Sequence, residues 1–325
     1  MNERSKHINF RKSAFQIAIK VAILLLLLLA FYWKGSHSGK QLIDWDQIRS
    51  LLQEGTWMYL LLAVALAPVN WLLEAKKWQL LLSKVHAIGW YQSIKNVFAG
   101  FAIGMFTPNR IGEAVGRVAE IPAEKRKAAL GLSFLSSYAQ LVASTTLGLL
   151  AFLVWNWEYN LLPYQLIYVA IGVVYLIALF ALVKSAARIS TWLPKLKWEW
   201  LAKQLQPILN SFSDRELPVG KAIALSAVRY VVFCFQLLLM IWGLGGDLGL
   251  STGMLTVASV FFLQSIAPSI ALLELGIRAS FLILLAGQLG VPEGIAIAAS
   301  FLLWSLNLVL PSLAGAILYE RNREK

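Results

Sequence analysis

Residues 97–117 read VFAGFAIGMFTPNRIGEAVGR, and this stretch decides how the rest of the chain is interpreted. The segment 97–107 is mostly apolar, but a helix of that length spans only about 16 Å, too little for a hydrocarbon core of about 30 Å. Pro108 then interrupts the helix, because proline lacks an amide hydrogen and its ring crowds the preceding turn. The stretch therefore predicts a segment that enters a membrane and returns to the same side.

The composition of the 325-residue chain favours a membrane setting. Hydrophobic residues make up 58% and charged residues 14% of the chain, whereas soluble domains contain about 25% charged residues. This composition excludes a soluble globular enzyme. Six apolar runs are long enough to be full spans: 14–33, 57–73, 128–154, 162–183, 222–243 and 294–318. We predict an all-α, polytopic membrane helix bundle of six spans that forms a single integral membrane domain over residues 1–325.

The distribution of Lys and Arg predicts the orientation of the bundle. Of the 29 Lys and Arg residues, 23 fall in five connections, namely 1–13, 74–96, 109–127, 184–221 and 319–325. The connections on the opposite side hold three. The positive-inside rule therefore places both termini in the cytoplasm. The net charge of +12 follows from this topology and does not indicate nucleic acid as a partner. Residues 184–221 mix Trp and Lys and are predicted to be a cytoplasmic interfacial segment.

A second broken segment lies at residues 251–287. It is apolar, is interrupted by Ala267-Pro268-Ser269, and has no Lys or Arg in either flanking connection. We expect it to re-enter from the side opposite to the first segment. A full crossing by residues 251–289 is the alternative. Two hairpins that enter from opposite faces predict an inverted repeat, with half-repeats over 57–154 and 222–318.

The two breaks carry the same charge pattern. Glu113 and Arg117 stand four residues apart, as do Glu274 and Arg278, so each pair lies on one helix face. Ionisable groups at membrane depth cost about 2.5–3.5 kcal/mol each and usually face a bundle interior. The pattern favours a polar cavity with a function, and the alternative is that each pair only neutralises itself. Arg110 either contacts an anionic headgroup or extends to the cytoplasmic interface.

Two glycines, Gly112 and Gly116, share the four-residue spacing of the first charged pair. Small residues at this spacing let another backbone approach closely within lipid. They predict that the first hairpin packs tightly.

The core Thr-Pro-Asn-Arg-Ile-Gly-Glu at residues 107–113 resembles the signature of a flippase-like family built on the transmembrane region of lysylphosphatidylglycerol synthase. Residues 268–278 resemble the second polar segment of that family. The resemblance implies a multi-pass protein of the bacterial cytoplasmic membrane that translocates lipid between leaflets. Because the chain ends at Lys325, soon after its last predicted span, we expect a stand-alone member without the aminoacyl-transfer domain and without synthase activity.

We therefore predict a lipid flippase that moves an anionic or amino-modified headgroup through a polar crevice, with membrane lipid as substrate and the bilayer as partner. The predicted substrate-binding residues are Asn109, Arg110, Glu113, Arg117, Glu274 and Arg278. No catalytic residue, metal or cofactor is predicted, and the oligomeric state stays open.

Two alternatives differ in class. One is a membrane enzyme acting on polyprenyl-linked sugars, with Asp44 and Asp46 holding a divalent ion, although an aspartate there also suits a helix N-cap. The other is a regulatory or assembly subunit without cargo.

Overall fold

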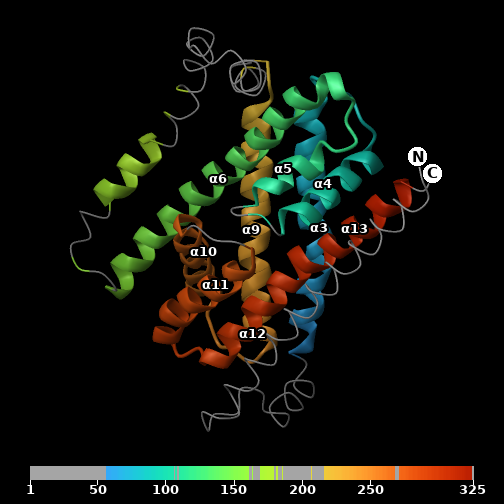
Figure 1. Cartoon of the computed structure of the whole chain (residues 1–325). Coiled ribbons are helices and arrows are strands. Elements are labelled where there is room, and N and C mark those ends of the chain that lie inside the picture. The colour runs from blue at the N-terminus through green and yellow to red at the C-terminus, as the bar shows by residue number, and fades with distance from the viewer. Residues whose placement is uncertain are drawn as a thin grey trace. The chain divides into compact units, whose positions relative to one another are not determined.

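The computed structural model of the chain describes residues 56–105, 107, 110–160, 163, 169–178, 181, 185, 206, 216–267 and 271–323. The chain divides into two units, Met1–Gln53 and Glu54–Lys325, and all described residues belong to the second. Every regular element in the described ranges is a helix, which confirms the all-α class (Figure 1). The predicted span 14–33, the aspartates at 44 and 46, part of 162–183 and most of 184–221 lie outside the described residues.

Four long apolar helices could each cross a membrane. They are α3 (Trp57–Leu82), α6 (Ala123–Tyr159), α9 (Val219–Gly243) and the continuous run Glu293–Leu318. The last run joins α12 (Glu293–Trp304), a π-helical turn η3 (Ser305–Val309) and α13 (Leu310–Arg323). These four helices correspond to four of the six predicted spans. The predicted span 162–183 is represented in the described residues by a short apolar helix, Val169–Ala178.

Helix α3 is longer than the hydropathy pattern predicts. The prediction ended it at residue 73 because charged residues, beginning with Glu74, follow. The helix instead continues to Leu82, since Trp78, Leu81 and Leu82 extend its apolar face and are fully buried. Glu74 therefore belongs to the helix and not to a cytoplasmic loop.

Each of the two broken segments forms a pair of separate helices. The first pair is α4 (Trp90–Gly104) and α5 (Ile111–Arg117), and the second is α10 (Leu250–Ile266) and α11 (Ala271–Ala286), which the 3₁₀ turn η2 (Gly287–Leu289) follows. Helix α4 begins at Trp90, so the helical part of the first segment starts earlier than the predicted Val97. Pro108 and Pro268 lie outside the described residues, but a helix stops on each side of both positions.

The two helix pairs lie at opposite ends of the central helices. In Figure 1, α4 and α5 lie beside the upper parts of α3 and α9, whereas α10 and α11 lie beside the lower part of α9. Helix α3 packs along α9, α6 packs against α10, and α13 packs against α4. Each hairpin is thus held between the central pair and a long helix that comes from the other half of the sequence.

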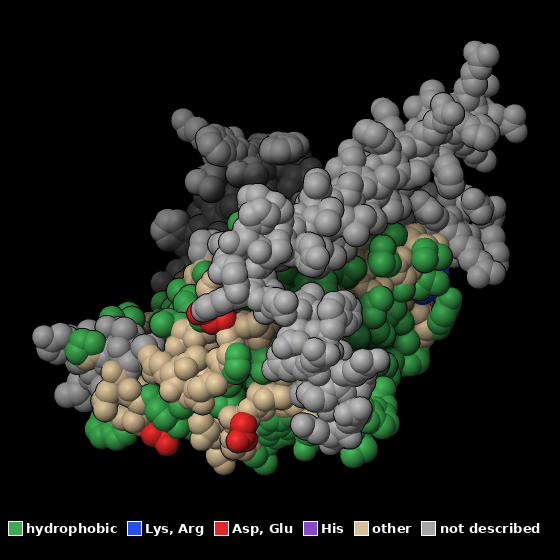
Figure 2. Space-filling model, turned by 90° about the horizontal axis from the view of Figure 1, so that it is seen from below, with side chains coloured by type: hydrophobic (Ala, Val, Ile, Leu, Met, Phe, Trp, Pro, Cys, Tyr) green, Lys and Arg blue, Asp and Glu red, His purple; other side chains and the backbone are tan. Residues whose placement is uncertain are grey.

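The two ends of this bundle differ in charge. Figure 2 views the lower end, where the described surface shows acidic side chains and hardly any Lys or Arg. The described connections 244–250 and 287–293 belong to this end and contain no Lys or Arg. The other end carries Lys84 in the connection after α3, and Lys125, Arg126 and Lys127 at the start of α6. Such an asymmetry is typical of multi-pass membrane proteins.

Candidate functional site: a charged cluster between the two hairpins

The centre of the site is Glu74, a carboxylate on α3 that is 2% exposed. Three cations surround it: Lys77 Nζ at 2.9 Å, Arg117 Nη2 at 2.8 Å and Arg229 Nη1 at 3.2 Å. They come from α3, α5 and α9, so one carboxylate joins the two central helices to the first hairpin. Helix geometry puts Glu74 and Arg229 about 12–15 Å below the upper ends of their helices.

Neutral side chains complete the hydrogen bonding around this centre. Arg117 Nη1 donates to Ser136 Oγ at 3.2 Å, and Ser136 Oγ in turn lies 3.4 Å from Glu74 Oε1. Lys77 Nζ donates to Ser226 Oγ at 3.2 Å, and Arg229 Nη1 donates to Gln140 Oε1 at 3.2 Å. Buried charges need such partners, because leaving water costs them several kcal/mol each.

Glycines bring the charged residues of the first hairpin to this centre. A Cβ on Gly116 would collide with the carbonyl oxygen of Ala99 and lie 2.7 Å from Gly100 Cα. On the facing helix, a Cβ on Gly104 would lie 2.9 Å from Glu113 Cβ. Backbone therefore packs directly on backbone between α4 and α5, as Gly112 and Gly116 predict. The predicted ion pair between Glu113 and Arg117 is also present.

Arg110 stands at the start of α5 in a strained backbone conformation. Its φ of 55° and ψ of 28° lie in the left-handed region, which non-glycine residues seldom adopt and which is frequent at functional sites. The hydroxyl of Thr107 supports the same turn, because it accepts the amide of Gly112 at 2.8 Å and donates to the carbonyl of Gly104 at 3.1 Å. This geometry directs Arg110 away from the first hairpin toward the second.

Arg110 and Glu274 form an ion pair between the two hairpins, with Nη2 and Oε2 2.6 Å apart. The four-residue spacing had suggested that Arg278 pairs with Glu274, but it does not. Its Nε donates to Gln264 Oε1 at 3.0 Å, and its guanidinium lies 5.4 Å from the ring centre of Phe261 on α10. Glu274 therefore makes its ion pair with the guanidinium of Arg110 in the first hairpin and not with a residue of its own helix. Of the predicted site residues, only Asn109 lies outside the described residues.

Sequence reasoning missed Glu74 and Lys77, and it noted Arg229 only as a cation within an apolar run. Glu74 and Lys77 were assigned to a loop because hydropathy falls where they begin. The signal that could have found them is the apolar pattern that resumes at Trp78, since a helix that continues past two charges must bury them. Nothing in the local sequence indicates that Arg229 meets Glu74.

A second polar layer lies one helical turn deeper than Glu74. Asn70 Nδ2 donates to Gln236 Oε1 at 2.9 Å, and Asn307 Nδ2 donates to the same oxygen at 2.8 Å. Gln236 Nε2 donates to the carbonyl of Ala63 at 2.7 Å, in the turn that precedes Pro68. Asn307 lies in the π-helical turn η3, a distortion often found at functional sites. These amides join α3, α9 and η3 directly beneath the charged centre.

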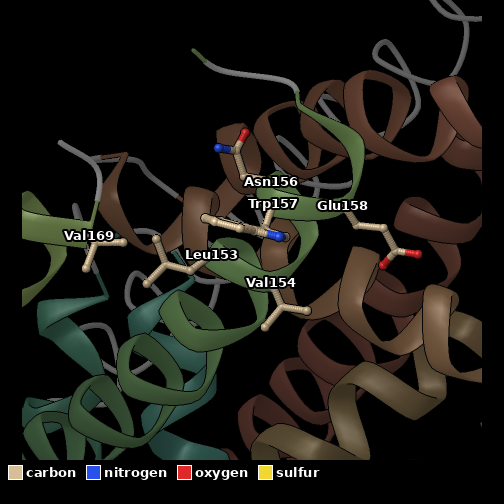
Figure 3. A pocket seen from close by; sticks show the side chains of 6 residues that line it. All are labelled: Leu153, Val154, Asn156, Trp157, Glu158 and Val169. Carbon is tan, nitrogen blue, oxygen red and sulfur yellow. The ribbon is translucent and has the colours of Figure 1, made fainter. Parts of the chain in front are cut away.

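A separate cleft of about 500 Å³ lies at the lower end of α6 (Figure 3). It is lined by Leu153, Val154, Asn156, Trp157, Glu158 and Val169. The cleft is mostly apolar, and no residue of the charged cluster lines it. Among the described residues, no three His, Cys, Asp or Glu side chains lie together as metal ligands would. The charged cluster and this cleft are therefore separate features of the described residues.

Four long apolar helices, with ionisable side chains buried between them, define a multi-pass membrane protein. Residues 17–315 match the model of the lysylphosphatidylglycerol synthase transmembrane region, and the chain belongs to that family. The match confirms the resemblance carried by residues 107–113. No curated protein and no solved structure matches the chain.

Proposed function

We propose that this protein moves a lipid headgroup between the two leaflets of a membrane through the charged cluster, while the acyl chains stay in the bilayer. The observation that carries the proposal is the ion pair between Arg110 and Glu274, because it joins two broken helices at the edge of a buried charged centre. Membership of a family named for the membrane region of a lipid-modifying synthase supports a role in lipid biology. We propose no chemical conversion of the lipid.

The energetic cost of the cluster supports a transport role. Buried ion pairs are often no more stabilising than apolar residues of similar volume, and the penalty of desolvating each ion is several kcal/mol. Arg117, Lys77 and Glu74 are at most 2% exposed, so they bear this penalty in full. A polar route for a headgroup gives a reason to keep such residues at membrane depth.

In this proposal the halves 57–154 and 222–318 are inverted repeats. Helices α3, α4, α5 and α6 then correspond to α9, α10, α11 and the α12–α13 run. The packing supports this correspondence, because α6 lies against α10 just as α13 lies against α4, with α3 and α9 paired at the centre. The hairpins are then re-entrant segments that open toward opposite leaflets, an arrangement suited to alternating access.

The same proposal includes orientation and location. The Lys- and Arg-rich end of the bundle faces the cytoplasm, and both termini lie on that side. The membrane is the bacterial cytoplasmic membrane, as the resemblance of residues 107–113 implies. Single cysteines at Lys84 and Asp247 in a Cys234→Ser background test the orientation. An impermeant thiol reagent added outside sealed cells should label position 247 and leave position 84 unlabelled.

A flipping assay tests the function. The purified chain is reconstituted in liposomes that contain acyl-labelled fluorescent phosphatidylglycerol, and dithionite bleaches the outer leaflet. Protein should raise the bleached fraction above one half, and Glu113→Gln or Arg278→Ala should abolish the effect. The matched control is Lys84→Gln, because Lys84 sits in an exposed ion pair with Glu216 outside the cluster. Bleaching that stays at one half with wild-type protein, for anionic, zwitterionic and cationic lipids alike, contradicts the proposal.

A further inference from the structure

The charges of the described cluster do not balance. Its three carboxylates are Glu74, Glu113 and Glu274, and its five cations are Lys77, Arg110, Arg117, Arg229 and Arg278. The cluster therefore carries an excess of two positive charges. An uncompensated charge in a low-dielectric interior is strongly destabilising. Such an excess is the electrostatic signature of a site that receives an anion.

All three carboxylates are already engaged by protein cations. Glu74 contacts three of them, Glu113 pairs with Arg117, and Glu274 pairs with Arg110. A cationic headgroup would therefore find no free carboxylate here. It would have to displace a guanidinium and leave that guanidinium buried without a partner.

The unused hydrogen-bonding groups point in the same direction. The Nε–H donors of Arg110, Arg117 and Arg229 are buried and have no acceptor among the described residues. Arginine donors matched with phosphate oxygens make strong charge-assisted hydrogen bonds. Three such donors around one cluster, together with the excess of positive charge, fit a group that carries several anionic oxygens.

The exposed fractions suggest how such a group arrives. The Arg110 side chain is 29% exposed, whereas those of Arg117 and Lys77 are 2% and 1% exposed. A phosphate can meet Arg110 first at the edge of the cluster, in exchange for Glu274, before it approaches the enclosed cations.

We propose that the cluster binds the phosphate of an anionic lipid headgroup and discriminates against headgroups made cationic by an amino-acid ester. The inference rests on the proposed function and names its substrate class. Specificity arises from attraction and repulsion together, because the net excess of two positive charges attracts a phosphate and repels an ammonium group. A protein with this cluster would carry the unmodified phosphate lipid and not its aminoacylated form.

Binding is tested on the full chain in detergent by thermal unfolding. The probes are dihexanoyl phosphatidylglycerol, its lysyl ester and inorganic phosphate. Phosphatidylglycerol should raise the unfolding temperature with an apparent affinity at least tenfold higher than that of the lysyl ester. A lipid site predicts weaker binding of inorganic phosphate than of the lipid, and a free-anion site predicts the reverse. Equal or tighter binding of the lysyl ester, or no response to either anion, overturns the inference.

Charge variants separate an anion site from a merely structural cluster. Arg229→Gln lowers the excess to one positive charge and should weaken phosphatidylglycerol binding about tenfold. Glu113→Gln raises the excess to three and should tighten binding, although it stops transport by releasing Arg117. A structural role alone would make both variants bind more weakly. Lys77→Gln replaces Arg229→Gln if that variant does not fold, and Lys84→Gln should bind as wild type does.

Transport of the same lipids tells the two proposals apart. If phosphatidylglycerol and its lysyl ester move equally fast in liposomes, the discrimination is wrong while lipid translocation stands. If neither lipid moves but phosphatidylglycerol binding still follows the charge of the variants, translocation is wrong while the anion site stands.

Discussion

The two hairpins share a sequence pattern but are held together differently. In the first, α4 and α5 meet through glycines, with backbone against backbone, and Glu113 pairs with Arg117 inside the hairpin. In the second, Gly276 has open space around it, and Glu274 turns to a partner in the other hairpin. The comparison teaches that close backbone packing holds the first hairpin together, whereas the second hairpin packs through apolar side chains and places its carboxylate on a partner in the other hairpin.

The largest expected loss of stability is at Glu74, the carboxylate that binds Arg117 of the first hairpin. Glu74→Gln leaves Lys77, Arg117 and Arg229 without their shared carboxylate, and we expect a loss of about 3–5 kcal/mol in the free energy of unfolding. Unfolding in mixed detergent micelles measures it. The double variant Glu74→Gln/Lys77→Gln should recover part of the loss. A double variant no more stable than Glu74→Gln would show that charge balance is not the cause.

Glycine substitution tests the packing difference directly. Gly116→Ala places a Cβ against Gly100 Cα at 2.7 Å and against the carbonyl of Ala99, so we expect a loss of about 2–3 kcal/mol. The matched control is Gly276→Ala in the second hairpin, where no atom of the described residues lies within 4 Å of the added Cβ. That variant should be as stable as wild type or slightly more so, since alanine favours a helix. Equal losses at the two positions would mean that the hairpins do not differ in packing.

Charge exchange tests the contact between the hairpins. Arg110→Glu and Glu274→Arg each place like charges at the position of the 2.6 Å pair, and each should lower the free energy of unfolding by about 1–2 kcal/mol. The double exchange should restore part of the loss, with a coupling energy of about 1 kcal/mol in a double-mutant cycle. Arg110→Lys, which keeps the charge, is the control. A coupling energy of zero would show that the two side chains do not interact.

The smallest expected effect concerns the turn that presents Arg110. Thr107→Val removes the hydroxyl that accepts the Gly112 amide, at a cost of about 1 kcal/mol, comparable with the loss of a helix cap. Thr107→Ser keeps the hydroxyl and should be neutral. If Thr107→Val slows lipid flipping far more than it lowers the unfolding temperature, the turn positions Arg110 for transport. Parallel losses would restrict Thr107 to a structural role.

The sequence predicted those features of the site that depend on neighbouring residues and missed those that depend on distant ones. The breaks at residues 105–110 and 267–270 were predictable because a proline interrupts a helix within a few residues of its own position. The Glu113–Arg117 pair was predictable because four residues make one helical turn. The same rule suggested an interaction between Glu274 and Arg278, and it was wrong there. Glu274 instead binds Arg110, which is 164 residues from it in sequence but has its Nη2 2.6 Å from Glu274 Oε2.

The sequence alone determined the membrane class of the chain, the places where its helices break and which short segments carry charge, because hydropathy, proline and i,i+4 spacing are local properties. Only the tertiary structure decided that α3 continues past Glu74 and that this carboxylate gathers cations from α3, α5 and α9. Partnership among buried charges depends on which helices pack side by side, and no interval along the chain specifies that packing.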